Sequence, residues 1–143
     1  MAVMGSFDAR QVELLCDNLS NVTQADVDRF FRQCANELTA RLLRKVQRRT
    51  PVGIYPSSYG KVGGTLRRNW TIGEIVHSGN MYTVEIINPT EYASYVEYGH
   101  RTRNHEGWVE GKFMMTISEN ELKEQTPSIL SRRFETFLRS VFT

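Results

Sequence analysis

The amino-acid sequence predicts an α+β domain with a long N-terminal helix, a small antiparallel sheet, a short central helix and C-terminal helices. Apolar residues recur at helical spacing over residues 24–49, and strand-like runs flank a glycine-bearing turn within residues 70–87. Two later segments begin with a capping side chain followed by proline. We divide the chain into an N-terminal segment, residues 1–22, and one α+β domain, residues 23–143.

The composition is that of one soluble globular domain. The chain has 143 residues, of which 40% are hydrophobic and 24% charged, enough for a single core. Residues 8–19 have the apolar spacing of a short helix. The first seven residues lack the basic region of a signal peptide, and no apolar run approaches the ~18 residues of a membrane span. We therefore expect no membrane contact and assembly in cytoplasm.

The long helix is predicted from its cap, its apolar stripe and its end. Thr23 suits the N-cap, and Asp26 places a carboxylate at the positive end of the helix dipole. Pro51 cannot continue the helix. The stripe expected to face the core consists of Val27, Phe30, Phe31, Cys34, Leu38, Leu42 and Val46.

A long loop and a basic block follow this helix. Residues 51–64 contain two prolines and four glycines, which favours a loop. Residues 41–73 hold eight Lys and Arg and no acid, whereas the rest of the chain holds ten Lys and Arg against sixteen acids. Such segregation favours a partner surface, either for nucleic acid or for an acidic face of a neighbouring copy. The candidate subunit-interface residues are Tyr55, Tyr59, Lys61, Arg67, Arg68, Arg101 and Arg103.

The sheet is predicted as a hairpin plus one short strand. The runs 70–76 and 81–87 flank a turn at residues 77–80, and Trp108 and Val109 suit a third strand. His77 in the turn is taken as a solvated side chain and not as a metal ligand.

The remaining helices are predicted from capping signals. Asn88 followed by Pro89 predicts the start of the short central helix, which Gly99 ends. We expect one C-terminal helix over residues 113–124 and a second that begins at Pro127.

The best candidate for catalysis is a polar cluster around the loop 100–107. It contains His100, Arg101, Arg103, His105 and Glu106, with Glu97 just upstream. A histidine and a carboxylate can transfer protons, so a small nuclease is a rival interpretation. Two histidines five residues apart match no specific metal-binding pattern, and no phosphate-binding or nucleophile motif occurs. We therefore predict no catalytic residue, no metal and no cofactor.

Nucleic-acid binding is a third interpretation. The basic block 41–73 interleaves cations with Tyr55, Tyr59 and Trp70, a combination that can hold single strands. Against this, the sequence pI of 8.6 lies below the value of about 9 that is typical of dedicated binding domains. The two cysteines, Cys16 and Cys34, are isolated and are expected to be reduced.

Residues 91–122 carry a specific combination of motifs. A Tyr-Ala-x-Tyr-Val-Glu-Tyr-Gly core is followed by a basic loop and then by a Gly-x-Phe-Met helix start. Earlier in the chain, Thr50-Pro51-Val52 and a Gly-x-Leu-Arg-x-x-Trp segment that ends at Trp70 occur in the same order. Over about residues 25–140 the chain resembles a large phage tail-component family, founded on the tenth gene product of an HK-type lambda-like coliphage. The motif residues taken as structural are Trp70, Tyr92, Ala93, Tyr95, Val96, Glu97, Gly99 and Phe113.

This resemblance implies a non-enzymatic virion protein that forms a ring, usually with six-fold symmetry, at the neck of a tail. The implied partners are copies of the chain itself, the head-completion (stopper) proteins, and the tail terminator, tube or sheath, with DNA only passing through the channel. The implied location is a virion or tail-like particle assembled in the bacterial host. A tail-terminator ring is the alternative within the same class. The loop 51–64 is longer than in many members of the family, so its contacts cannot be carried over.

Overall fold

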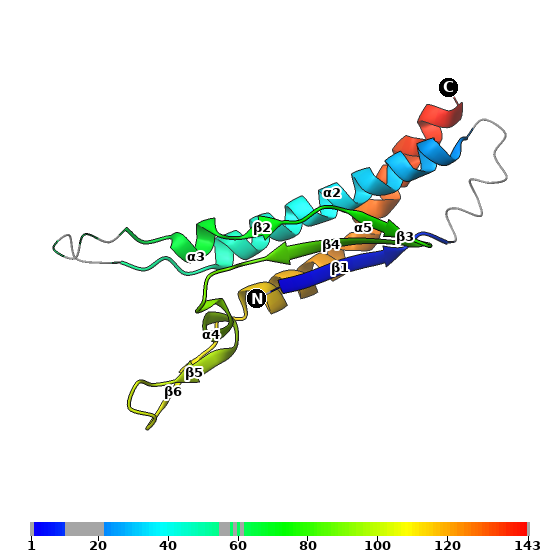
Figure 1. The fold of residues 1–143 in the computed structure, drawn as a ribbon. Helices are drawn as coiled ribbons and strands as arrows, with labels where there is room; N and C mark the ends of the chain where they lie inside the picture. Colours follow the sequence, from blue (N-terminus) through cyan, green and yellow to red (C-terminus); the bar gives the residue numbers. More distant parts are fainter. Residues whose placement is uncertain (1, 11–21, 55–57, 59, 61, 143) are drawn as a thin grey trace.

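The computed structural model describes residues 2–10, 22–54, 58, 60 and 62–142. Two long antiparallel helices lie beside a small sheet, and an arm projects from one end of this body (Figure 1). The elements are β1 (Ala2–Asp8), α2 (Gln24–Arg49), α3 (Thr65–Arg68), β2 (Thr71–Ile72), β3 (Val76–Ser78), β4 (Met81–Ile87), α4 (Ala93–Tyr98), β5 (Gly99–Arg101), β6 (Trp108–Glu110) and α5 (Met114–Phe142). The predicted α+β class is confirmed, whereas the candidate helix over residues 8–19 falls largely outside the described residues.

Helix α2 forms as its sequence predicts. The Thr23 hydroxyl accepts the backbone N–H of Asp26 at 3.1 Å, and the Asp26 carboxylate accepts the N–H of Thr23 at 3.2 Å. This reciprocal capping satisfies two donors that have no partner inside the helix. Every residue of the predicted stripe is buried except Leu38, which is half-buried against the core. The helix ends at Thr50, one residue before Pro51.

The main sheet is antiparallel with β4 in its centre. Strand β1 pairs with one edge of β4, and β2 and β3 pair with the other edge. The predicted hairpin is confirmed as β3–β4, but its first strand is interrupted. Ile72 pairs with Ile86, and Val76 pairs with Thr83. An advance of four residues from β2 to β3 therefore corresponds to an advance of only three residues along β4. This extra residue is a β-bulge, which bends the strand between β2 and β3.

Strand β1 is an element that the sequence did not predict. It pairs along its whole length with β4, from Ala2 opposite Ile87 to Asp8 opposite Met81. The segment is short, contains Gly5 and lacks clean alternation, so no local signal separates it from a loop. Residues 2–8 of the N-terminal segment therefore form part of the main sheet.

The C-terminal region is one helix, and the prediction of two was wrong. Helix α5 continues through Pro127, which cannot donate a backbone hydrogen bond to the preceding turn. A proline inside a helix costs about 3 kcal/mol. Leu122 and Ile129 are buried on either side of it, and each such burial contributes roughly 1.5–3 kcal/mol. Packing on both sides thus holds the helix together across the proline.

The central helix begins later than predicted. Asn88 does not cap it, because α4 starts at Ala93. The Asn88 side chain instead accepts the N–H of Thr90 at 3.1 Å and donates to the carbonyl of Leu66 at 2.8 Å. Asn88 is fully buried, so it ties the end of β4 to α3. Gly99 ends α4 as predicted.

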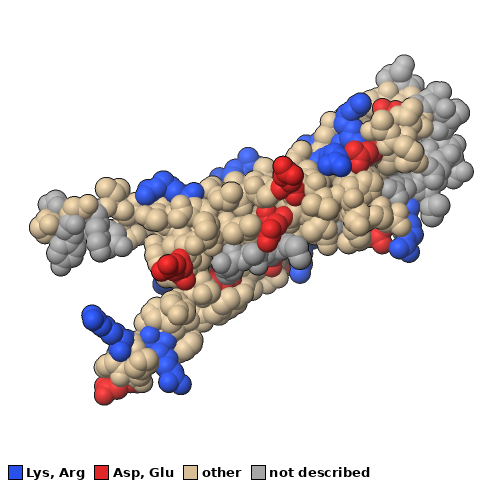
Figure 2. All heavy atoms as spheres, in the orientation of Figure 1, with Lys and Arg blue, Asp and Glu red and all other residues tan. Residues whose placement is uncertain are grey.

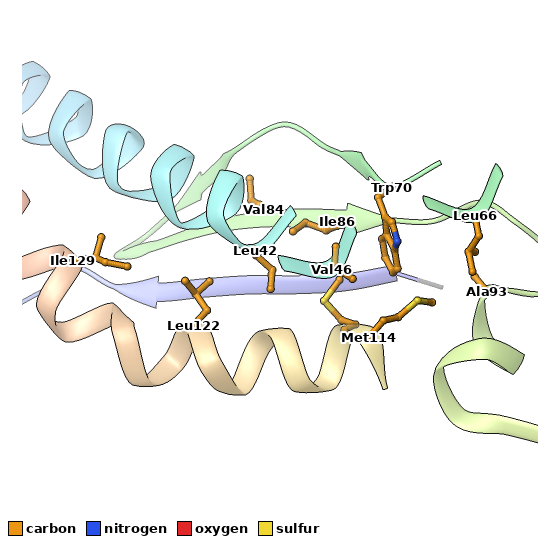
Figure 3. Close-up of a cluster of buried hydrophobic side chains, with 11 residues drawn as sticks. Leu42, Val46, Leu66, Trp70, Val84, Ile86, Ala93, Met114, Leu122 and Ile129 are labelled. Atoms are coloured by element: carbon orange, nitrogen blue, oxygen red, sulfur yellow. The ribbon is translucent and has the colours of Figure 1, made fainter. Parts of the chain in front are cut away.

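The core has two clusters. One contains Phe30, Phe31 and Tyr82 and receives Phe134 and Phe137 from the end of α5. The other lies near the arm, where helix, sheet and α3 side chains meet (Figure 3); its members include Leu42, Val46, Leu66, Trp70, Val84, Ile86, Ala93, Met114 and Leu122. Cys34 is free and buried, and burial raises the pKa of its thiol to about 11. Cys34 is therefore a thiol at neutral pH, packed as a small apolar side chain.

Candidate interface on the projecting arm

The motif-bearing region builds an arm that leaves the body of the molecule (Figure 1). We define the arm as residues 92–113, which include α4, β5 and β6. Strands β5 and β6 have three residues each and form a two-stranded sheet of their own, so the predicted third strand exists but does not join the main sheet. A pair of strands this small is marginally stable without further packing.

The arm exposes most of its large apolar side chains. Tyr95, Tyr98 and Trp108 are each more than half exposed. The full set comprises Tyr92, Tyr95, Tyr98, Trp108, Val109 and Phe113, with Ile117 of α5 exposed beside them. Soluble monomers rarely expose large contiguous apolar areas, and aromatic residues are enriched at interfaces. This arrangement is typical of a surface that another protein covers.

Glu97 fixes the base of the arm to α5. Its carboxylate is 1% exposed and accepts the backbone N–H groups of Met115 and Thr116, both at 2.9 Å, and the Thr116 hydroxyl at 2.7 Å. These N–H groups lie in the first turn of α5, where no helical partner is available. A buried anion at the positive end of a helix is favourable. Glu97 is thus a helix cap, and its lone pairs are engaged.

At the base of the arm, Gly99 and Gly111 allow the outgoing and returning segments of the chain to pass in close contact. Gly99 has φ +88°, and a Cβ there would collide with the carbonyl of Val109. A Cβ on Gly111 would collide with the carbonyl of Glu97. The crossing is closed by backbone hydrogen bonds from Lys112 to Val96 at 2.7 Å and from Phe113 to Glu97 at 3.0 Å. The direction of the arm is therefore set by backbone contacts that no larger side chain would allow.

The tip of the arm is a self-contained basic loop. The N–H of Thr102 donates to the carbonyl of Gly107 at 2.9 Å, which closes the loop 102–107. Arg101 and Arg103 are exposed, and neither makes an ion pair with another described residue. Figure 2 shows basic side chains gathered around this tip. Two of the four predicted interface arginines are thus exposed and available to a partner.

The basic block is anchored to the core at Thr50. The Thr50 hydroxyl accepts the Trp70 indole N–H at 2.8 Å and donates to the carbonyl of Val46 at 2.6 Å. The Arg67 guanidinium donates to the Thr50 carbonyl through Nε at 3.1 Å and Nη2 at 2.7 Å. Two motifs that are separate in the sequence therefore form one junction. Arg68 donates to the carbonyl of Gly63 at 3.0 Å.

Carboxylates of the same chain neutralise part of the basic block. Lys45 and Arg49 both pair with Glu121 of α5, and their hydrogen bonds hold the pKa of that carboxyl below its usual range. Arg41 pairs with Glu37, whose pKa is lowered chiefly by a hydrogen bond from Arg133. The block is therefore not one continuous cationic face. The candidate interface residues Tyr55, Tyr59 and Lys61 lie outside the described residues.

The motif residues divide into a buried and an exposed set. Trp70, Ala93, Glu97 and Gly99 are buried and Val96 is half-buried, whereas Tyr92, Tyr95 and Phe113 are exposed. Tyr92 is among the motif residues predicted to be structural, but it is 45% exposed and does not belong to the core that contains Trp70. Tyr92, Tyr95 and Tyr98 recur every three residues, so they line one side of α4 while Ala93 and Glu97 face inward. In the sequence, this three-residue spacing of tyrosines could have indicated that they form a stripe on one side of the helix.

The residues of the rival catalytic interpretation are divided between the base and the tip of the arm. Glu97 is engaged as a cap, while His105 lies in the exposed tip and His100 is half-buried near Tyr95 with a ring-centroid distance of 5.8 Å. Among the described residues, no group of three or more His, Cys, Asp or Glu can hold a metal ion. In the same residues, no helix is both long and apolar enough to span a membrane.

The fold and the arm define a class of small α+β protein that presents an exposed aromatic arm from a two-helix body. Residues 13–99 match the model of the family described as "Bacteriophage HK97-gp10, putative tail-component". The match covers more than half of the chain, so the chain belongs to this family of phage tail components. The family is structural, which suggests a non-enzymatic virion protein. Searches of curated proteins and of solved structures found no match.

Proposed function

We propose that the protein forms a ring at the neck of a phage or phage-like tail, where it joins head-completion (stopper) proteins to the tail tube or terminator. The observation that carries this proposal is the arm, whose exposed aromatic side chains stand on a base fixed by Glu97 and by the crossing of Gly99 and Gly111. A rigid apolar element is suited to assembly, because little conformational entropy is lost when it binds.

A closed ring requires two unlike surfaces on each subunit that meet head to tail. The arm projects from one end of the elongated body and supplies one such surface (Figure 1). The proposed partners are copies of the chain in a hexamer, together with the stopper, terminator, tube or sheath. DNA passes through the channel without being read, and the protein resides in the particle.

A tail-terminator ring remains the alternative within the same structural class, and the same arm would serve it. The nuclease interpretation loses support because Glu97 caps α5, and the nucleic-acid interpretation loses support because Glu121 and Glu37 neutralise part of the basic block. We expect no nuclease turnover with or without divalent metal. Metal-dependent activity that disappears in His100→Ala would contradict this expectation.

The proposal is tested by particle mass and symmetry. Purified protein is examined over a range of concentrations by mass photometry and by negative-stain electron microscopy. We expect a closed ring with six-fold symmetry that coexists with monomer at low concentration. A protein that stays monomeric at all concentrations, or that forms open filaments, would contradict the ring.

A further inference from the structure

An apolar groove runs between β1 and α5 on the body of the molecule. Its volume is about 540 Å³. The lining comes from four elements and includes Leu38, Leu42, Tyr82, Val84, Ile86 and Leu122, with Gly5 and Ser6 of β1 on one rim and Glu119 and Lys123 of α5 on the other. Figure 3 shows Leu122 pointing from α5 toward the sheet. The groove thus lies directly over core side chains, of which Tyr82, Ile86 and Leu122 are at most 9% exposed.

Glu119 at the rim of this groove lacks a partner. It is half-buried and makes no hydrogen bond or ion pair with another described residue. Burial raises the pKa of its carboxyl, against a smaller lowering by Lys123 one turn further on. A carboxylate that loses water without gaining a partner is unfavourable, so the site would be stabilised by an added cation.

The arm carries the complementary chemistry. Arg101 of β5 lies directly opposite Trp108 of β6, so a free guanidinium and an exposed indole stand side by side near the tip. Arg103 adds a second unpaired cation in the loop. Tryptophan, tyrosine and arginine are the residues that most often dominate the binding energy of interfaces.

We propose that the arm of one copy docks in the β1–α5 groove of a second copy, with Trp108 over the apolar lining and Arg101 and Arg103 beside Glu119. This inference rests on the proposed ring. The two surfaces lie on different parts of one chain, so the contact is head to tail and can close by rotation. In the structure the arm projects from the body, and no residue of the arm lines the groove of the same chain.

The charges make the proposal specific. Pairs that are removed from water at an interface contribute more than exposed surface pairs. We therefore expect Arg101→Glu with Arg103→Glu to weaken self-association at least about tenfold, and Glu119→Lys to do the same. Combining all three substitutions in one chain should restore association to within about threefold of wild type.

Matched controls use charges outside both surfaces. Arg44→Glu with Arg48→Glu on α2, and Glu124→Lys on α5, make the same charge changes at exposed positions that do not line the groove. We expect both controls to associate like wild type. Thermal melting of each variant at low concentration, where the protein is monomeric, checks that the fold is retained.

The measurement is sedimentation velocity over a concentration series. Weakening by each reversal and recovery in the triple variant would support the docking. If the charge-reversal variants associate like wild type, or if association is not restored in the triple variant, the docking is contradicted but the ring is not. A wild-type protein that never self-associates would overturn both the docking and the proposed function.

Discussion

At the scale of single residues, Thr50 and Glu97 explain why the motifs occur together. Thr50 receives donors from Trp70 and Arg67, which lie in another segment of the chain. Glu97 receives donors from the start of α5. The resemblance marked Glu97 as structural and placed Thr50 in a motif, but it could not indicate their partners, because each bond joins segments that only the fold brings together.

Thr50→Val is predicted to destabilise the protein. The substitution keeps the shape of the side chain but removes the acceptor for the Trp70 indole N–H, and an unsatisfied buried donor costs about 1–3 kcal/mol. The free energy of unfolding, measured by urea denaturation, should fall by that amount. As a control, Thr71→Val changes an exposed threonine and should shift the free energy of unfolding by less than about 0.5 kcal/mol. Equal stability of the two variants would contradict the junction at Thr50.

Glu97→Gln is predicted to loosen the start of α5. The amide has one acceptor oxygen in place of two, and its NH₂ group would face backbone N–H donors, so we expect a loss of about 1–3 kcal/mol. Hydrogen exchange of residues 114–118 should accelerate in the variant. The control Glu91→Gln removes an exposed carboxylate and should leave that exchange unchanged. Unchanged protection in Glu97→Gln would refute the capping role.

At the scale of elements, the sequence predicted the helices and strands that depend on interactions between residues close together in the chain. Helix α2 follows from its apolar stripe and its capping box, and strand β4 from its alternation. Strand β1 was missed because its pairing with β4 is distant in sequence. The break at Pro127 was predicted because a cap followed by proline is locally the same pattern as a helix start, and only the burial of Leu122 and Ile129 overrides it.

Pro127→Ala distinguishes one helix from two. In a continuous α5 the substitution restores a backbone donor and removes a steric clash, so stability should rise, by up to about 3 kcal/mol. If residue 127 were the first residue of a separate helix, proline would be favourable there, and its loss would be neutral or destabilising. The free energies of unfolding of wild type and Pro127→Ala, measured by urea denaturation, distinguish the two cases. Ser128→Ala, also exposed on α5, serves as the comparison and should have a small effect.

At the scale of the whole molecule, the sequence predicted the class of protein better than the site. The segregated charge predicted a basic surface, but Glu37 and Glu121 pair with Arg41, Lys45 and Arg49, which uses part of that charge inside the chain. The aromatic motif was predicted to be structural, whereas its tyrosines lie on the exposed side of α4. Both differences arise because a sequence pattern does not specify how an element is oriented against the rest of the fold.

We propose that this chain forms a neck ring held together through its arms. An electron cryomicroscopy map of the intact particle, resolved well enough to place α2, α5 and the arm, would test this. We expect a ring of this chain at the neck, coaxial with the DNA channel, with Trp108 of each copy covered by its neighbour. A chain that is absent from the particle, that lies elsewhere than the neck, or that leaves its arm exposed to solvent would contradict it.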